Sequence, residues 1–475
     1  MNDIIIIGAG IIGGAVAREL ARYRCRITVL EKENDVAAGT SKANSGIIHA
    51  GFNAPFGSLK AKYNVMGNRM YDKTAAELDF PFKRTGAVVL GFTENEFYKL
   101  KQLYQNGINN GIADLSLLTK EEVLKLEPNI SPRVYAALYA PTSGITGPYE
   151  ATIAYAEGAA LNGVDFVFNS AVTAVNRENN RFIVTCGQKK YRADVIVNCA
   201  GVYADAINNM ISPEKIKITP VKGEYLLVDK SAKPCVSRTI FTLPTDVTKG
   251  VLVTPTVHGN TIVGPTAYNV NDKDDVATTI SGLNEAWSKG VRLVPALNKK
   301  AVISQFAGLR AYSDLADFIV GFAAPGFYNL AGMVSPGLSG APALAEQAAR
   351  DIALHLNLAA NSDFIVERKG IPAFNQLSSE EKVKLIKTNP RYANIICRCE
   401  AVSEGEIVEA IRRYPGARDL DGIKRRTRAG MGRCQGGFCM PKVAAILAKE
   451  LSLPFDKITK KGGSSYLVSG KVRQQ

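Results

Sequence analysis

The N-terminal strand and the glycine-rich turn after it constrain this chain more than any other stretch. Four consecutive isoleucines, Ile4 to Ile7, predict a strand buried on both faces, as in the centre of a parallel sheet. The strand leads into Gly8, Gly10 and Gly13 and then into a helical stretch. Gly8 permits a tight turn, Gly10 lets a pyrophosphate approach the backbone, and Gly13 lets the helix pack close to the strand. The pattern therefore predicts a dinucleotide-binding βαβ unit.

An acidic residue completes this unit at the expected distance. A second apolar strand, residues 27–30, ends on Glu31, about 20 residues after the first glycine. Its carboxylate can accept a hydrogen bond from a ribose hydroxyl and disfavours a ribose that carries a phosphate. The helix N-terminus offers free N–H groups and partial positive charge to the other phosphates. The unit therefore favours FAD or NAD over NADP.

Length and composition indicate a globular protein of more than one domain. The 475 residues exceed one ordinary core, so we expect two or three domains. Lysine and arginine outnumber acidic residues by 58 to 44, and the net charge of +14 suits anionic ligands or an acidic partner, although a solvated basic surface explains it equally well. The sequence has no nucleic-acid-binding motif and no apolar run near the roughly 18 residues that span a bilayer. The first strand begins at once, so we expect a cytoplasmic protein without a signal peptide, and peripheral membrane attachment through a partner stays open.

A second stretch, residues 37–51, is rich in small and hydrogen-bonding side chains. Small residues let the backbone approach a flat ligand, and Thr40, Ser41 and Asn44 can bond phosphate or ring atoms. With the glycine turn, this stretch resembles the FAD-dependent D-amino-acid-oxidase-like superfamily. There it runs beneath the pyrophosphate and along the isoalloxazine. The resemblance implies an α/β fold with a Rossmann-like FAD-binding domain and an antiparallel-sheet substrate domain.

The resemblance also implies that the FAD-binding domain is discontinuous. The buried strand near 193–198 and the Ala-Gly that follows it resemble the second flavin fingerprint, and residues 327–340 resemble the last return, before a helix expected over 341–356. Residues 1–375 are assigned as follows: an FAD part at about 1–80, 145–215 and 325–360, and a substrate part at about 81–144 and 216–324.

Family alignment implies a set of residues that line the FAD. The turn at Gly337 opens a helix, whose N-terminus would stabilise the negative charge of reduced flavin. The full set is Gly8, Gly10, Ile12, Gly13, Glu31, Lys32, Thr40, Ser41, Asn44, Ser45, Gly46, Ile48, Val172, Ala200, Gly201, Gly332, Pro336, Gly337, Leu338 and Ser339.

The eight cysteines divide unevenly. Four are scattered, and each is most simply a reduced thiol: Cys25, Cys186, Cys199 and Cys235. The other four form a C-x-C pair and a C-x4-C pair near the C-terminus, and two close pairs of thiolates suit a metal centre. Disulfides are improbable in a cytoplasmic chain, and zinc is the better alternative to an iron–sulfur cluster.

The C-terminal block resembles the bacterioferritin-associated-ferredoxin-like [2Fe-2S] domain. The resemblance implies a small helical domain over residues 394–460, after a polar linker at 376–393 and before a tail at 461–475. It makes the cluster ligands Cys397, Cys399, Cys434 and Cys439.

A flavin and a one-electron cluster in one chain favour a dehydrogenase that exports electrons over an oxidase that passes them to oxygen. Over nearly its whole length the chain resembles the large subunits of anaerobic-type, FAD-dependent glycerol-3-phosphate dehydrogenases. The resemblance implies oxidation of sn-glycerol 3-phosphate to dihydroxyacetone phosphate. Electrons would pass through the [2Fe-2S] cluster to flavoprotein or iron–sulfur subunits of a hetero-oligomeric complex.

Other substrates and another role stay open. Better-known glycerol-phosphate enzymes carry Leu-Arg-Tyr where this chain has residues 52–54, and residues 57–62 resemble L-2-hydroxyglutarate dehydrogenase. Amino acids or opines form a third substrate class. From a different functional class, the chain could be a non-catalytic subunit that relays electrons for another enzyme.

Such an oxidation needs a base for the alcohol proton and cations for the substrate anion. His49 lies in the flavin-facing stretch, and Arg310, in a Gly-x-Arg pattern, matches the family's anion-binding arginine. Lys222 and Tyr225 resemble a segment that points active-site side chains from the sheet. His258 is typical of a hairpin turn, and we expect it at the surface.

Overall fold

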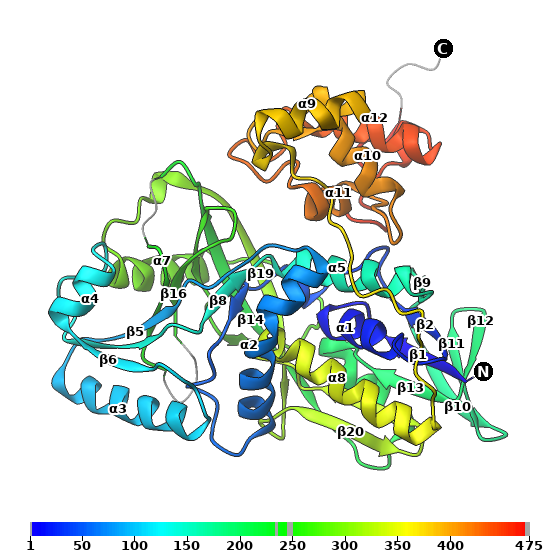
Figure 1. The fold of residues 1–475 in the computed structure, drawn as a ribbon, viewed down its shortest axis with the longest axis horizontal. Coiled ribbons are helices and arrows are strands. Elements are labelled where there is room, and N and C mark those ends of the chain that lie inside the picture. Colours follow the sequence, from blue (N-terminus) through cyan, green and yellow to red (C-terminus); the bar gives the residue numbers. More distant parts are fainter. Residues whose placement is uncertain (1, 233–235, 245–249, 471–475) are drawn as a thin grey trace.

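The computed structural model describes residues 2–232, 236–244 and 250–470, so Cys235, predicted to be a reduced thiol, lies outside the described residues. Two large sheets lie side by side in Figure 1, and a small helical domain stands above them, reached by a long extended segment. This arrangement confirms the predicted fold class: a Rossmann-like α/β part, a mainly antiparallel sheet and a C-terminal helical domain.

The first sheet is built around the isoleucine strand. β1 (Asp3–Ile7) pairs in parallel with β2 (Arg26–Leu30) on one side and β13 (Val195–Asn198) on the other, so Ile4 to Ile7 are buried as predicted. The remaining strands are β9 (Asp165–Val167), β20 (Ile319–Ala324) and β21 (Phe327–Ala331). The order β20–β21–β13–β1–β2–β9 is parallel except for the edge strand β20.

Helices with small apolar side chains cover this sheet. One face packs against α1 (Ile11–Leu20), α5 (Pro148–Leu161) and α8 (Gly337–Leu356), with α2 (Leu59–Leu78) against α8. The other face carries α6 (Ala204–Ile211) and a three-stranded sheet of β10 (Ala174–Glu178), β11 (Arg181–Cys186) and β12 (Lys189–Ala193). Two expectations were wrong. α8 begins at Gly337 rather than at residue 341, and β20, assigned to the substrate part, pairs with β21 in this sheet.

The second sheet lies beside the first and is mainly antiparallel. Its strands, in order, are β18 (Tyr268–Asn269), β14 (Ile218–Val228), β17 (Thr261–Gly264), β16 (Leu252–Pro255), β15 (Thr239–Thr242), β5 (Ala87–Gly91), β7 (Ala136–Ala140) and β6 (Ser116–Thr119), with β19 (Val302–Ser313) paired to β14. The strands run antiparallel except at the β15–β5 pair. α7 (Ile280–Leu293) packs on β14 and β17, and α3 (Glu94–Asn109) and α4 (Lys120–Leu126) pack near β5–β7.

A small three-stranded sheet connects the two large sheets. It consists of β3 (Ile47–Ile48), β8 (Gly144–Thr146) and β4 (Phe82–Lys83). Short 3₁₀ turns occur at η1 (Thr40–Lys42), η2 (Gly201–Tyr203), η3 (Lys299–Ala301), η4 (Phe374–Gln376), η5 (Pro390–Ala393) and η6 (Phe455–Lys457). Residues 37–51, the stretch predicted to face the flavin, therefore run through η1 and β3.

The C-terminal domain has its own apolar core. It contains α9 (Ser379–Thr388), β22 (Ile395–Cys397), β23 (Val402–Ser403), α10 (Glu404–Arg412), α11 (Leu420–Thr427) and α12 (Met440–Leu451). The predicted linker at 376–393 was wrong, because Ser378 and Glu381 form a capping box that starts α9, and the crossing is made by the extended residues 357–373. Residues 461–470, predicted as a tail, fold back in a turn with a bridge between Thr459 and Tyr466.

Candidate active site and cluster site

The glycine turn has the shape that a dinucleotide needs. Gly8 has a φ of +104°, which L side chains rarely adopt, and a Cβ there would overlap the backbone oxygen of Cys199. Glu31 accepts hydrogen bonds from the backbone N–H groups of Ala9 (2.7 Å) and Glu33 (3.0 Å). Burial raises the pKa of Glu31. The acid is thus held at the mouth of the turn, where the residues present fit a ribose.

Side chains of the η1 loop hold that loop in place. The Ser41 hydroxyl accepts a hydrogen bond from the N–H of Ile11 at 2.9 Å, at the first turn of α1, where phosphates bind. Thr40 donates to the carbonyl of Leu309 at 2.6 Å, and Asn44 donates to the carbonyls of Thr40 and Ser41, each at 3.2 Å. Thr40 and Asn44 therefore shape the backbone, and Ser41 is the one of these three side chains that stands at the helix N-terminus.

Most of the other predicted FAD residues gather at one edge of the six-stranded sheet. Gly8, Ala200 and Gly332 follow the carboxyl ends of β1, β13 and β21, and ligands bind at this edge in open α/β sheets. The segment from Pro336 to Ser339 opens α8 at the same edge. Lys32 points elsewhere, because its ammonium pairs with Asp274 at 3.1 Å. The remaining members of the predicted set in the same loops and strands are Gly10, Ile12, Gly13, Ser45, Gly46, Ile48, Val172 and Gly201.

One face of the second sheet packs on the η1 loop. In the β14–β19 pair, Val221 lies opposite Arg310 and Gly223 opposite Gly308, so these residues share a face. Gly308 lies against Ala43, and a Cβ at Gly308 would overlap the Ala43 carbonyl oxygen. The absence of that side chain lets the sheet approach the loop, and it brings Arg310 toward the flavin-facing stretch.

Arg310 keeps a spare donor on this face. Its Nη2 donates to the carbonyl of Thr266 at 2.6 Å, while its buried Nε has no hydrogen-bond partner among the described residues. Tyr225, on the same face of β14, stacks on Phe306 with ring centroids 4.8 Å apart. Burial raises the pKa of Tyr225, so the phenol stays neutral. A half-buried cation with an unused N–H fits a small anionic substrate.

The structure separates Lys222 from Arg310. Adjacent residues of a strand point to opposite faces, so Lys222 lies on the face covered by α7. Its ammonium forms a 2.7 Å ion pair with Asp275, and Glu224, on the same face, accepts from the hydroxyl of Thr279. We therefore do not place Lys222 at the site, because strand alternation and this ion pair direct it away.

His49 is held rigidly at the end of β3. Its N–H donates to the hydroxyl of Ser339 at 2.8 Å, and its carbonyl accepts from Asn64 and Asn68 at 3.1 and 3.0 Å. The ring nitrogen Nε2 lies 3.1 Å from the hydroxyl of Ser335. The ring borders a small pocket lined by Gly51, Phe52, Asn53, Ala54, Asn64 and Pro336. A histidine fixed beside the turn that opens α8 can serve as a proton acceptor for a ligand bound next to this turn.

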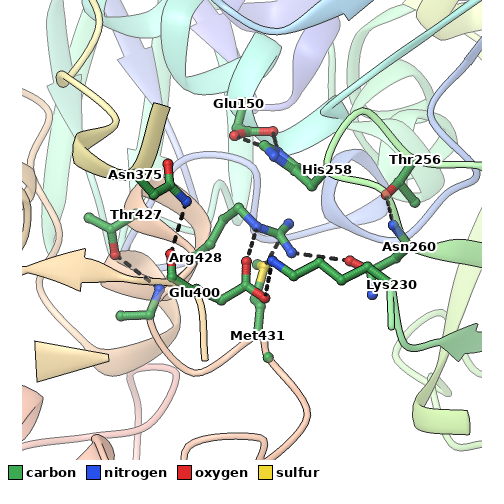
Figure 2. Close-up of polar contacts among 12 residues, drawn as sticks. Glu150, Lys230, Thr256, His258, Asn260, Asn375, Glu400, Thr427, Arg428 and Met431 are labelled. Atoms are coloured by element: carbon green, nitrogen blue, oxygen red, sulfur yellow. Dashed lines mark hydrogen bonds and ion pairs between the residues drawn. The ribbon is translucent and has the colours of Figure 1, made fainter. Parts of the chain in front are cut away.

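We expected His258 at the surface, but the structure places it in a contact between two segments. Its Nε2 lies 2.9 Å from Glu150 at the start of α5 (Figure 2). Only 13% of its side chain is exposed. The first turn of α5 covers the hairpin at this point. Sequence reasoning missed this pair, and also Ser335 beside His49, because neither pairing has a local sequence signal.

The four C-terminal cysteines form two pairs. The sulfur of Cys399 lies 3.5 Å from that of Cys434, and Cys439 donates a hydrogen bond to Cys397, which lowers the pKa of Cys397 to about 6. In the described part of the chain, no group of three or more His, Cys, Asp or Glu side chains surrounds one metal-ion position. A [2Fe-2S] cluster has two irons and four cysteine ligands, so two pairs of thiols fit its donor set.

Backbone N–H groups also point at these sulfurs. Burial opposes ionisation of Cys434, but the N–H groups of Gly436 and Phe438 reach its sulfur, and its pKa is lowered. The N–H groups of Gly430 and Glu400 act in the same direction on Cys397. Such donors stabilise thiolates and the negative charge of a reduced cluster. Cys25, in contrast, is a free thiol whose pKa burial raises to about 11.

Comparison with known families agrees with this geometry. Residues 3–350 match the FAD-dependent oxidoreductase family, and residues 395–449 match the BFD-like [2Fe-2S] binding domain. The chain belongs to the FAD-dependent oxidoreductases. FAD and a [2Fe-2S] cluster are thus its cofactors, and the predicted enzyme class is confirmed. Zinc, the alternative for the cysteines, is not supported.

Two relatives with high identity to this FAD-dependent oxidoreductase are named for glycerol 3-phosphate. The chain is 47% identical to a glycerol 3-phosphate dehydrogenase of Caloramator mitchellensis, over 100% of both chains. It is 34% identical to a glycerol 3-phosphate oxidase of Mycoplasma pneumoniae, over 74% of this chain and 94% of that protein. The dithionite-reduced, FAD-bound structure of L-α-glycerophosphate oxidase from Mycoplasma pneumoniae superimposes with a TM-score of 0.73 at 33% identity, covering 77% of this chain and 98% of the other. Within the described residues, no helix has both the length and the apolar character to span a membrane.

Proposed function

We propose that this FAD-dependent oxidoreductase oxidises sn-glycerol 3-phosphate to dihydroxyacetone phosphate and passes the electrons to a partner. The observation that carries the proposal is the full-length similarity to a glycerol 3-phosphate dehydrogenase, which includes the C-terminal cluster domain. When bound, FAD supplies the hydride acceptor, and the [2Fe-2S] cluster supplies a carrier that takes electrons singly.

Three residues have roles in this proposal. The guanidinium of Arg310, whose Nε has no partner among the described residues, binds the phosphate. Tyr225 lies on the same face of the sheet. His49 accepts the hydroxyl proton while the C2 hydrogen leaves as hydride, because it is held at the pocket beside Pro336. The ligands of the cluster are Cys397, Cys399, Cys434 and Cys439.

A partner that accepts electrons belongs to the same proposal. A cluster that takes electrons one at a time needs an external acceptor for each of them, so we propose a flavoprotein or iron–sulfur subunit in a hetero-oligomeric complex. The half-exposed pair Cys399 and Cys434 lies nearer to the surface than the buried pair Cys397 and Cys439, and it is the side from which an acceptor would reach the cluster.

A second substrate has a specific observation in its favour. The L-2-hydroxyglutarate dehydrogenase of Escherichia coli is 30% identical over 56% of this chain, and an arginine that binds phosphate also binds carboxylate. The similarity covers little more than half of this chain and only 64% of that enzyme. Glycerol 3-phosphate is therefore the stronger proposal.

An anaerobic titration tests the function. Flavin absorbance near roughly 450 nm is followed as glycerol 3-phosphate, L-2-hydroxyglutarate and a panel of amino acids are added separately to cofactor-replete protein. Bleaching by glycerol 3-phosphate with formation of dihydroxyacetone phosphate supports the proposal. Bleaching by the hydroxy acid alone would move the substrate, and bleaching by none of these compounds would favour a subunit that only relays electrons.

A further inference from the structure

The cluster domain contacts both the FAD-binding part and the substrate part. We call the border between these two parts, where the cluster domain sits, the seam. The end of α11 packs on α5 of the FAD-binding part. The loop after α11 faces the segment that follows β14 and the β16–β17 turn of the substrate part (Figure 2). The loop includes Arg428 and Met431 and runs on to the ligand Cys434. The side of this domain that carries the cysteine loops is thus joined to both parts that enclose the flavin site.

A buried carboxylate lies at the centre of this contact. Glu400 follows the ligand Cys399 directly, and only 3% of its side chain is exposed. Its two oxygens accept from different domains: the Arg428 guanidinium at 2.9 Å, from its own domain, and the Lys230 ammonium at 3.2 Å, from the substrate part (Figure 2). Asn375 donates to its backbone carbonyl at 2.9 Å. The carboxylate is therefore satisfied only when the two domains are together.

Arg428 extends the contact to the FAD-binding part. Its two terminal nitrogens reach the hydroxyl of Tyr149 and the side-chain oxygen of Asn260, both at 3.3 Å. Tyr149, at the start of α5, also lies 3.5 Å from the sulfur of Met431. Arg428 has a φ of +68°, a backbone conformation that favours glycine. An arginine there is explained by what its side chain binds, since the backbone alone would be better served by glycine.

A second ion-pair cluster fixes the other end of the domain. Asp35, in the loop between Glu31 and η1, has a fully buried carboxylate that pairs with Arg425 at 2.6 Å and Arg426 at 2.7 Å, both from α11. This pairing orients α11 on the FAD-binding part, and the network around Glu400 then sets how its end meets the substrate part. The Asp35 ion pairs anchor α11, whereas the network around Glu400 lies next to the cluster ligand Cys399.

We propose that Glu400, Arg428 and Lys230 form a charge latch that positions the [2Fe-2S] domain for electron transfer from the flavin. The inference rests on the proposed function only for the source of the electrons. The latch residues are positioning residues: they touch neither substrate nor flavin, and they hold the loops of Cys399 and Cys434 against the seam. With the latch formed, electrons pass from the flavin to the cluster while the domains stay in contact, and the cluster domain does not have to move.

The test uses two variants of the full-length, cofactor-loaded protein and one matched control. Lys230→Ala removes the latch cation from the substrate part, and Arg428→Gly removes the other cation at a backbone position that glycine favours. Arg412→Ala is the control, because it removes an exposed arginine whose ion pair with Glu450 lies inside the cluster domain and includes no residue of the other domains. Iron and FAD contents are measured first.

Two readouts are then compared. In anaerobic single turnovers, flavin bleaching is recorded separately from cluster reduction, which is followed by electron paramagnetic resonance. We expect bleaching to be unchanged and cluster reduction to slow by about tenfold or more in both variants, because a small misplacement is enough to slow a positioned reaction. Hydrogen exchange on cluster-free protein gives a second readout, and residues 147–151 and 256–260 should exchange faster in the variants.

Each result decides the proposal. Unchanged cluster reduction in Lys230→Ala, equal slowing of bleaching and cluster reduction, or the same slowing in Arg412→Ala would overturn it. If Arg428→Gly fails to retain the cluster, Lys230→Ala decides alone, because Lys230 lies in the other domain. Flash photoreduction of the flavin repeats the experiment without any substrate, so a wrong substrate in the proposed function would not be mistaken for a failed latch.

Discussion

Arg310 donates from Nη2 to the backbone carbonyl of Thr266 at 2.6 Å and leaves its buried Nε unpaired among the described residues. The carbonyl fixes the orientation of the guanidinium, so the remaining donor points in a set direction. Gly308, two residues earlier, lets the same face touch Ala43 in the flavin-facing loop. The sheet therefore presents one preoriented cation to the site, and binding an anion there requires little further ordering.

Replacement of Arg310 should weaken substrate binding. We expect Arg310→Ala to raise the KM for glycerol 3-phosphate by about 10- to 100-fold, the size of a lost charged hydrogen bond. Arg310→Lys should recover part of this loss, because it restores the charge without the fork. Steady-state kinetics with an artificial acceptor measures the effect, and Arg292→Ala, an exposed arginine on α7, is the control. An unchanged KM would remove Arg310 from the substrate site.

Replacement of His49 should slow the chemical step. We expect His49→Gln to reduce the rate of flavin bleaching by roughly 100-fold or more, the usual contribution of a positioned general base. The measurement is anaerobic stopped-flow at saturating substrate. His355→Gln is a matched control, since that ring packs on Phe322 with centroids 4.6 Å apart at the far end of α8. Equal rates in the two variants would exclude His49 as the base.

Acid should weaken the anchor between α11 and the FAD-binding part. Burial alone would raise the pKa of Asp35, but Arg426 and Arg425 more than offset it, and the pKa lies below its ordinary value. A carboxyl whose pKa is lowered by folding stabilises the native state above its unfolded pKa of about 3.9, and this stabilisation is lost as the pH falls through the folded value. Stability should therefore fall more steeply below about pH 4 in the native protein than in Asp35→Asn.

The same variant should be destabilised at neutral pH. Removing one partner of a buried ion pair leaves charges uncompensated, so we expect Asp35→Asn to lower the free energy of unfolding by about 3 kcal/mol. Denaturant unfolding followed by circular dichroism checks this value. Asp72→Asn removes an exposed partner of Arg84 and should change stability by less than about 1 kcal/mol. A similar loss in both variants would contradict the anchor.

Replacement of one cluster ligand should remove the cluster and leave the FAD bound. We expect Cys434→Ser to lose its iron and the cluster absorbance while it keeps FAD and bleaches with substrate within about twofold of the native rate, because hydride transfer needs only the flavin and not the cluster. Cys25→Ser, at a thiol outside the cluster, should keep both cofactors. Iron analysis and visible spectra measure the outcome. Retention of full iron in Cys434→Ser would show that the ligand set is wrong.

Local patterns made the FAD fold and the cluster domain predictable. The strand Ile4 to Ile7, the turn at Gly8 and the acid Glu31 lie within one βαβ unit, whose geometry depends on neighbours in the chain. The linker prediction at 376–393 failed for a local reason as well, since polar composition was given more weight than the capping box at Ser378 and Glu381. The prediction of an exposed His258 was wrong because its partner, Glu150, lies more than a hundred residues away in the chain.

By itself, the sequence determined the dinucleotide-binding turn and the two thiol pairs, because residue spacing and backbone chemistry decide both. The tertiary structure alone decided that Arg310 faces the flavin loop while Lys222 faces α7, since this depends on the register of β14 against β19. It alone brought Lys230 to Glu400 and Asp35 to Arg426. These pairs join segments far apart in the chain, and only the packing of three domains, driven by burial of their surfaces, sets which charges meet.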